Sequence, residues 1–391
     1  MTDTQILAWV ITFYYLWDCL LWAPARTYVF AHGFTGKWAP VGPLELLKRR
    51  NLQMHLLPLI PPAGQVHCGS FPPLSFSDEN VVAFTRFAPN PGTRSAQSAA
   101  MIPWKQIESI RSSGPEIHVN HTLFFKASNS VEAMFLAKWM QRIRKAKNGK
   151  RGEAIQDYLK EIFHKRKAKD RINETTPAIN QMKWLSTFIF LLLFIITPAA
   201  HWKFGLVNAW IPLLATGEIL MWLQGFLFFR LQKKHFPEAD QERFVCTLST
   251  ALTPPGAIRA PDHVSKYLLF HTHPLIPASL LLDTEQKEKM AGWVLRDLHH
   301  SLSLPEFQSN SEALETIHHF HDLLKNQTEK FLKNEGFKLE ELLQPPVPSE
   351  KEHCSFCPRC TVQYITKKGT CEDCGGIKLA PLALVEKNPK D

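Results

Sequence analysis

Hydrophobic residues in this chain fall into three long blocks, at 6–22, 184–202 and 206–229. The first block contains one charged residue, the second has no Asp, Glu, Lys or Arg, and the third has only Glu218. A helix of about 20 apolar residues crosses the ~30 Å hydrocarbon core of a bilayer. The pattern therefore predicts three transmembrane α-helices: a signal anchor at 1–24 and a helical hairpin at 184–229.

Shorter hydrophobic segments at 64–146 alternate with polar residues, which is typical of strands and predicts an α+β domain. The candidate strands are 74–76, 81–87, 99–104, 107–111, 116–119 and 122–126, with a hairpin turn at Asn120 and His121. Ser130 can cap a helix whose apolar residues recur every four positions, at Val131, Phe135, Trp139 and Ile143. Several strands closed by a C-terminal amphipathic helix are similar to the pleckstrin-homology-like architecture; an unspecified α+β domain is the alternative.

The segment 147–183 is predicted to be a basic amphipathic helix next to the second span. Its apolar positions share one helical face, at Ile155, Tyr158, Leu159, Ile162 and Phe163, and Lys and Arg surround them. Such a helix either lies on the anionic cytosolic leaflet of a membrane or is a solvated connector. Nucleic acid is not expected as a partner, because the apolar face and the neighbouring span favour lipid.

The remaining segments complete a multi-domain membrane protein. Residues 25–63 are irregular and membrane-proximal, 230–343 form a mainly helical cytosolic domain, 344–353 are a Pro-rich linker, and 354–391 hold a small metal module and the tail. Helices are expected at 237–252, 284–302 and 309–336, with a further apolar segment at 263–282 that Pro274 and Pro277 interrupt.

The distribution of charge sets the expected topology. The chain has 45 Lys+Arg and 36 Asp+Glu, a net charge of +9, and basic residues are dense between 142 and 171. Positively charged loops remain in the cytosol, so we expect an external N-terminus, a cytosolic C-terminus and a multi-pass location in a plasma membrane or bacterial inner membrane. Ala23-Pro24-Ala25 resembles a signal-peptide cleavage site, but the basic region that precedes such peptides is missing.

Two C-x2-C pairs near the C-terminus predict a metal site. Cys357-Pro-Arg-Cys360 and Cys371-Glu-Asp-Cys374 each place two thiolates on a tight turn, and two such turns form a tetrahedral cage for one structural Zn2+. These residues resemble the zinc-ribbon module over 354–380, which implies a metal and a small β-rich fold. Cys354 also forms a C-x2-C pair with Cys357, so it could replace one ligand. Clustered thiolates indicate a reducing compartment.

Motifs for catalysis are missing from the sequence. It has no H-E-x-x-H, P-loop, G-x-S-x-G or glycine-rich dinucleotide turn, and Glu-x-x-His matches such as Glu315 with His318 are expected by chance. The sequence therefore predicts a scaffold or interaction component at the cytosolic membrane face, with a protein partner or self-association into a homo-oligomer. The alternative is a transporter subunit or intramembrane enzyme that works through Glu218, a carboxyl expected to accept a hydrogen bond from Thr12 or Thr197 inside the helix bundle.

Overall fold

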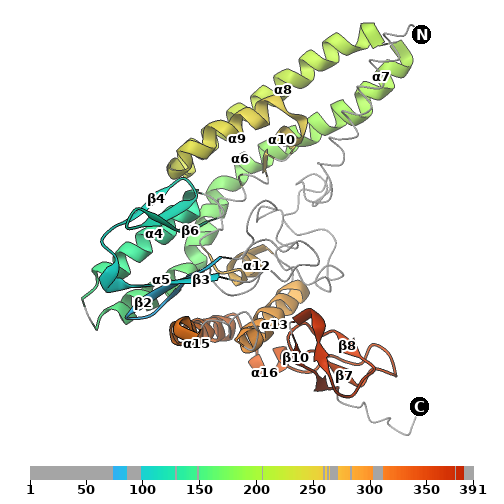
Figure 1. Cartoon of the computed structure of the whole chain (residues 1–391). Coiled ribbons are helices and arrows are strands. Elements are labelled where there is room, and N and C mark those ends of the chain that lie inside the picture. Colours follow the sequence, from blue (N-terminus) through green and yellow to red (C-terminus); the bar gives the residue numbers. More distant parts are fainter. Residues whose placement is uncertain are drawn as a thin grey trace.

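The computed structural model describes residues 74–85, 98–127, 130–147, 149–204, 206–258, 260–261, 264, 272–281, 284–302, 311–374 and 376–382. Within these residues, small antiparallel sheets and a helix form one region, and a long helical arm extends from it (Figure 1). Further helices and a small β-rich module at residues 355–382 lie on the other side of the sheets.

The first sheet has the order β1-β2-β3, formed by Leu74–Phe76, Asn80–Thr85 and Ser98–Pro103. The second has the order β4-β5-β6, formed by Ile110–Ser113, Glu116–Val119 and Thr122–Lys126. Asn120 and His121 make the predicted turn with positive φ of 50° and 68°. Asn is one of the few residues that readily adopt a positive φ. The Asn120 amide oxygen also accepts from the backbone N–H of Glu108 at 2.7 Å, which fixes the turn. The strand predictions are confirmed to within a few residues.

Helix α4 (Ser130–Lys145) begins at Ser130, as predicted, and covers β4 and β5. The Ser130 hydroxyl has no hydrogen-bond partner, so it does not cap the helix. The predicted apolar face of α4 packs against the core, since Trp139 and Ile143 are buried. The next segment, predicted as one helix, is divided into α5 (Arg151–Ile162) and α6 (Lys165–Leu191). The His164 ring accepts from the Lys167 N–H at 3.1 Å and so caps the second helix.

The apolar face of α5 packs inside the protein. Tyr158 is buried and its ring lies 5.3 Å from that of Phe76 and 6.4 Å from that of Phe320, so it joins the first sheet to a distant helix. Ile155 and Ile162 are buried in the same core. This face is therefore not available to a lipid surface, and the helix connects the sheets with the arm.

The prediction of three transmembrane helices is wrong for the described residues, since none of their helices is long and apolar enough to cross a membrane. The block 184–202 is divided between the end of α6, a π-helical segment η4 (Leu192–Ile196) and α7 (Thr197–Phe204). The block 206–229 lies in α8 (Leu206–His235). The first block, 6–22, lies outside the described residues. The finding also overturns the multi-pass location in a plasma or bacterial inner membrane and the topology based on it.

A polar junction inside the arm gives a physical reason for this correction. Gln224 of α8 is fully buried, and its amide nitrogen donates to the carbonyl oxygens of Met182 and Ala257 and to the Ser186 hydroxyl, at 2.9–3.1 Å. Ala257 belongs to α10 (Pro254–Ile258). Part of the apolar surface that suggested lipid contact therefore packs on protein, around hydrogen-bonded polar groups.

Helix α9 (Asp240–Leu252) follows the 3-10 turn η5 (Pro237–Ala239) and runs back along α8 (Figure 1). The two helices are in close contact at Gly225, where an added Cβ would lie 3.0 Å from the Cβ of Ala251 and 3.4 Å from the Thr247 carbonyl oxygen. A larger residue there would require these neighbours to move by a few tenths of an ångström.

We expect Gly225→Ala to be less stable than Gly217→Ala by about 1–3 kcal/mol, because overpacking costs that much while both variants gain the same helix propensity. Gly217 is a matched control on the same helix, since a Cβ there would lie 3.7 Å from Leu192 and Leu193, an ordinary contact. Urea unfolding of the full chain measures the difference. Equal stability of the two variants would contradict the close packing of α8 on α9.

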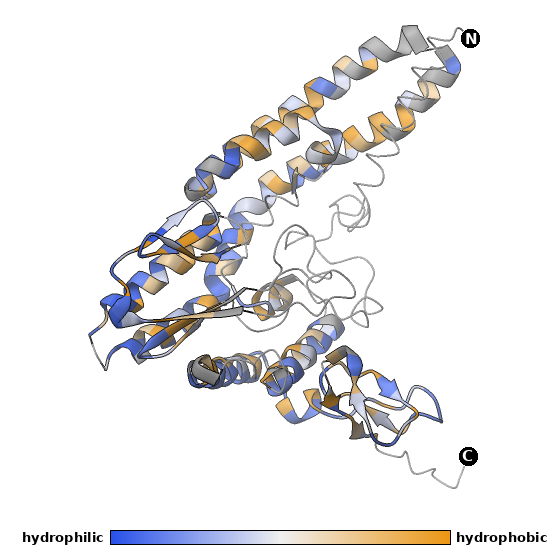
Figure 2. Cartoon of the chain, viewed as in Figure 1, coloured by the Kyte–Doolittle hydropathy of each residue, from blue (hydrophilic) through white to orange (hydrophobic). Residues whose placement is uncertain are grey.

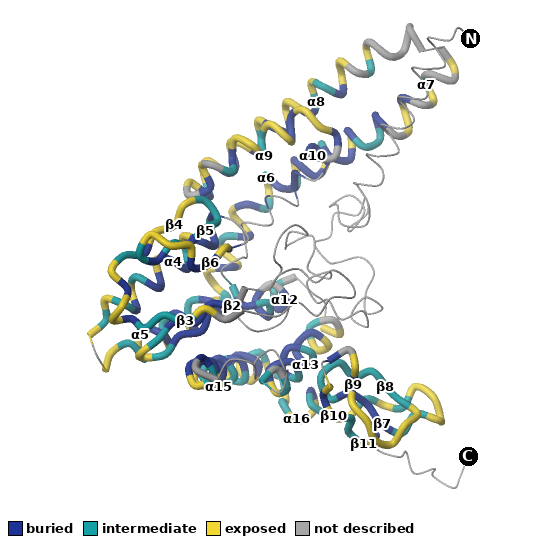
Figure 3. The backbone as a smooth tube through the Cα atoms, in the orientation of Figure 1, coloured by how far each residue is buried: buried dark blue, intermediate teal, exposed yellow. Residues whose placement is uncertain are grey.

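The predicted helices of the C-terminal half are α13 (Thr284–Ser301) and α15 (Ser311–Asn334). The apolar segment before them contains α12 (Leu275–Leu281), which includes Pro277, and α15 is followed by α16 (Leu339–Leu342). Gly336 has a φ of 87°, which ends α15 where the sequence indicated. Short strands then form the metal module: Ser355–Phe356 (β7), Gln363–Tyr364 (β8), Thr370–Cys371 (β9), Ile377–Lys378 (β10) and Ala380–Pro381 (β11). Figure 3 shows buried residues running through α15 and α13 toward this module.

Candidate metal centre

The two C-x2-C pairs are brought together by short antiparallel pairings. Strand β7 leads into Cys357 and pairs with β8, while β9 ends at Cys371 and pairs with β10. The turn between Cys357 and Cys360 is closed by the Thr361 N–H, which donates to the Cys357 carbonyl at 2.8 Å. Thr361 has a φ of 61°, so the backbone curls back sharply after the first pair.

The sulfur atoms of Cys357, Cys360, Cys371 and Cys374 all lie within 4.8 Å of one another. Sulfurs at the corners of a tetrahedron around Zn2+, each about 2.3 Å from the metal, would be about 3.8 Å apart. The Sγ atoms of Cys360 and Cys371 are 3.7 Å apart. The geometry therefore fits a tetrahedral four-thiolate site, and three of the four cysteines are buried.

Cys354 lies outside this group. Its thiol donates to the carbonyl oxygen of Ile365 at 2.9 Å, on the opposite strand of the hairpin. His353, also close in sequence, contacts the Ser349 hydroxyl at 3.1 Å through Nδ1. Cys354, the alternative ligand that the sequence left open, is therefore not part of the sulfur cluster.

Protein groups surround the sulfur cluster with positive charge and hydrogen-bond donors. The Tyr364 hydroxyl donates to the Cys371 sulfur at 3.1 Å. Burial and this hydrogen bond raise the pKa of Tyr364. Arg359, from the first turn, is close enough for the Cys374 sulfur to help raise the pKa of its guanidinium. Four thiolates around a divalent cation carry a net charge of −2. The nearby guanidinium of Arg359 and hydroxyl of Tyr364 therefore stabilise the metal-bound form of the site.

Arg359 also joins the module to the helical body. Its Nε donates to a carboxylate oxygen of Asp297 at 2.8 Å, and the Asp297 side chain is only 4% exposed. Burial opposes the charge on Arg359, but Asp297 outweighs it and raises the pKa of the guanidinium. Arg359 lies between the ligands Cys357 and Cys360, and Asp297 lies on α13, 62 positions earlier in the chain. The ion pair therefore fixes the first ligand turn to α13.

The other chemistry considered from the sequence does not assemble into a site among the described residues. His318 and His319 are exposed, whereas the buried His321 contacts the Leu298 carbonyl at 2.7 Å. Glu218 is half-buried and accepts a hydrogen bond from Trp222, one turn later in the same helix, at 2.8 Å. Thr197, its expected partner, donates instead to the Leu192 carbonyl at 2.7 Å.

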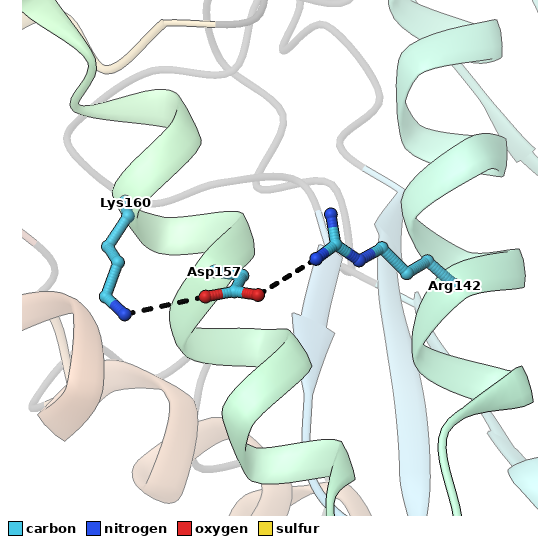
Figure 4. Close-up of polar contacts among 3 residues, drawn as sticks. All are labelled: Arg142, Asp157 and Lys160. Atoms are coloured by element: carbon cyan, nitrogen blue, oxygen red, sulfur yellow. Dashed lines mark hydrogen bonds and ion pairs between the residues drawn. The ribbon is translucent and has the colours of Figure 1, made fainter.

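A hollow lies between α4 and α5, with a volume of about 540 Å³. Its charged lining is Lys138, Arg142, Lys145, Lys150, Glu153 and Asp157. Figure 4 shows Asp157 between Arg142, at 2.9 Å, and Lys160, at 3.5 Å. These side chains are 42–66% exposed, and exposed ion pairs contribute about 0–1 kcal/mol each. The hollow is thus a solvated surface with partly neutralised charge.

No protein-family model matches the chain, and comparison with curated proteins and with solved structures gives no match either. The resemblance to the pleckstrin-homology-like architecture therefore remains a pattern of elements.

Proposed function

We propose that the C-terminal module holds one structural Zn2+ through Cys357, Cys360, Cys371 and Cys374. The supporting observation is the closed set of four sulfurs within 4.8 Å of one another. Catalytic zinc sites keep one coordination position for water or substrate, whereas four thiolates fill every position. The chemistry of the ligand set thus favours a structural role.

The protein, on this proposal, is an interaction or scaffold component and not an enzyme. The metal holds the first turn in the shape that presents Arg359 to Asp297, so metal binding and attachment of the module to α13 are linked. A small rigid module on a helical body is suited to presenting a surface to a partner.

Metal analysis of the purified full chain tests this proposal. We expect one zinc per chain, and replacement by Co2+ should give the absorption of a tetrahedral cobalt–thiolate centre. Dialysis against a strong chelator should remove the metal together with the ordered structure of residues 355–382. A metal-free preparation that keeps this module folded would refute a structural zinc.

A further inference from the structure

Helices α8 and α9 expose an unusual amount of apolar surface. The exposed apolar side chains, here called the apolar face, are Ile219, Trp222, Leu223, Phe226 and Phe229 of α8 and Phe244, Val245, Leu248 and Leu252 of α9. Ile219, Phe226 and Phe244 are 60–67% exposed. Large side chains of this kind are normally buried, and a contiguous exposed patch marks a binding surface. Figures 2 and 3 show hydrophobic and exposed residues along both helices.

The two sets of side chains form one surface. On α8, Trp222 and Phe229 lie one turn before and after Gly225, the position that touches Ala251 of α9. On α9, Leu248 lies one turn before Ala251. The helices run in opposite directions, so these neighbours project to the same side of the contact line between them. The opposite side of α8, with Met221, Gln224 and Phe228, is buried.

Positive charge borders the apolar face at one end. Arg230 and Lys233 of α8 are exposed and continue its stripe, four and seven residues after Phe226, and the exposed Lys234 follows. Two acidic side chains of α9 follow these residues. Glu242 accepts from the Ser130 N–H at 2.9 Å, and Asp240, whose side chain is 82% exposed, pairs with Arg243 at 2.6 Å. The exposed cations outnumber these carboxylates, so the border is cationic.

We propose that the apolar face of α8 and α9 binds the surface of an anionic lipid bilayer, with the helical pair in the plane of one leaflet. Aromatic and aliphatic side chains can enter the boundary between headgroups and acyl chains, while Arg230, Lys233 and Lys234 contact lipid phosphates. A protein partner or a second copy of the chain would cover the same apolar residues but has no need of the cationic end.

Vesicle flotation of the full chain tests the proposal. Vesicles of phosphatidylcholine with phosphatidylglycerol should carry the protein upward, and vesicles of phosphatidylcholine alone should carry much less. We expect Phe226→Ser with Leu248→Ser to weaken binding by about tenfold or more, because both buried apolar area and penetration are lost. Arg230→Gln with Lys233→Gln should weaken binding to anionic vesicles by a similar factor of about ten, while leaving the apolar face intact.

The matched control is Leu123→Ser, which removes a 56% exposed leucine from β6, outside the apolar face. Each variant should keep its helix content and its zinc, so that failure of lipid binding is distinguishable from failure of the metal site. The proposal is overturned if the native chain does not float with anionic vesicles or if both double variants bind as well as the native chain. Self-association that Phe226→Ser and Leu248→Ser abolish, without any vesicle binding, would assign the face to a second copy.

Discussion

Replacement of Cys371 by Ser is expected to release the metal and unfold the C-terminal module. Cys371 is fully buried, and its sulfur lies 3.7 Å from that of Cys360 and accepts a hydrogen bond from Tyr364. A small module with two-residue strands buries little apolar surface, so its folding depends on the metal, which contributes about 10–16 kcal/mol in zinc-binding peptides. The variant should contain far less than one zinc per chain, and protease should cut within residues 355–382.

Cys354→Ser is the matched control, because it removes a thiol of the same module that bonds only to a backbone carbonyl in this structure. This variant should keep one zinc per chain and resist protease as the native chain does. Full zinc binding by Cys371→Ser, or equal loss from both variants, would show that the ligand set is different from the one proposed.

Local sequence signals predicted much of this architecture. The strands from Leu74 to Lys126 were predicted from short apolar runs rich in β-branched and aromatic residues, which are visible without knowledge of the fold. Burial itself alternates in β5, whereas β1 is buried throughout and β4 and β6 do not alternate. The start of α4 at Ser130 and the end of α15 near Gly336 were also predicted. The Ser130 hydroxyl itself is buried without a hydrogen-bond partner, so the expected side-chain cap does not form. The cysteine cluster was predicted from spacing alone, since a C-x2-C pair fixes two sulfurs on one turn.

The helical arm was misread because apolar composition does not report what covers a helix. An apolar helix can face lipid, another helix or a mixture of these. Here Gln224 and Ser186 form a buried polar junction with Ala257 of α10, a contact between residues up to 71 positions apart. Nothing in the local pattern indicates that this short helix returns to pack on α6 and α8.

The surroundings of the metal centre were missed for the same reason. In the sequence, Arg359 is only one of the two unspecified residues inside a C-x2-C turn. Asp297 is one acidic residue of an amphipathic helix. Their pairing depends on the packing of the module against α13, which no periodicity encodes. A basic residue inside a knuckle and an acidic residue on the apolar side of a helix are the only local signals available.

Arg359→Ala is expected to lower the free energy of unfolding of the full chain by about 3–5 kcal/mol, because removal of one partner leaves the other charge buried. The Asp297 side chain is 4% exposed and that of Arg359 22%, so solvent screens this pair little. The same variant removes the positive charge next to the Cys374 sulfur and should weaken zinc binding about 10–100-fold. Urea unfolding and competition with a zinc chelator measure the two effects.

Two further variants separate attachment of the module from metal binding. Asp297→Asn keeps the contact of Arg359 with Cys374, so it should lower stability but leave zinc affinity close to native. Arg359→Met with Asp297→Leu should recover most of the lost stability, because an apolar pair of similar size leaves no buried charge unpaired. Lys289→Ala is the control on the same helix: its exposed pair with Glu285 should contribute no more than about 1 kcal/mol. If Arg359→Ala proved as mild as Lys289→Ala, the module would not be held on α13 by this ion pair.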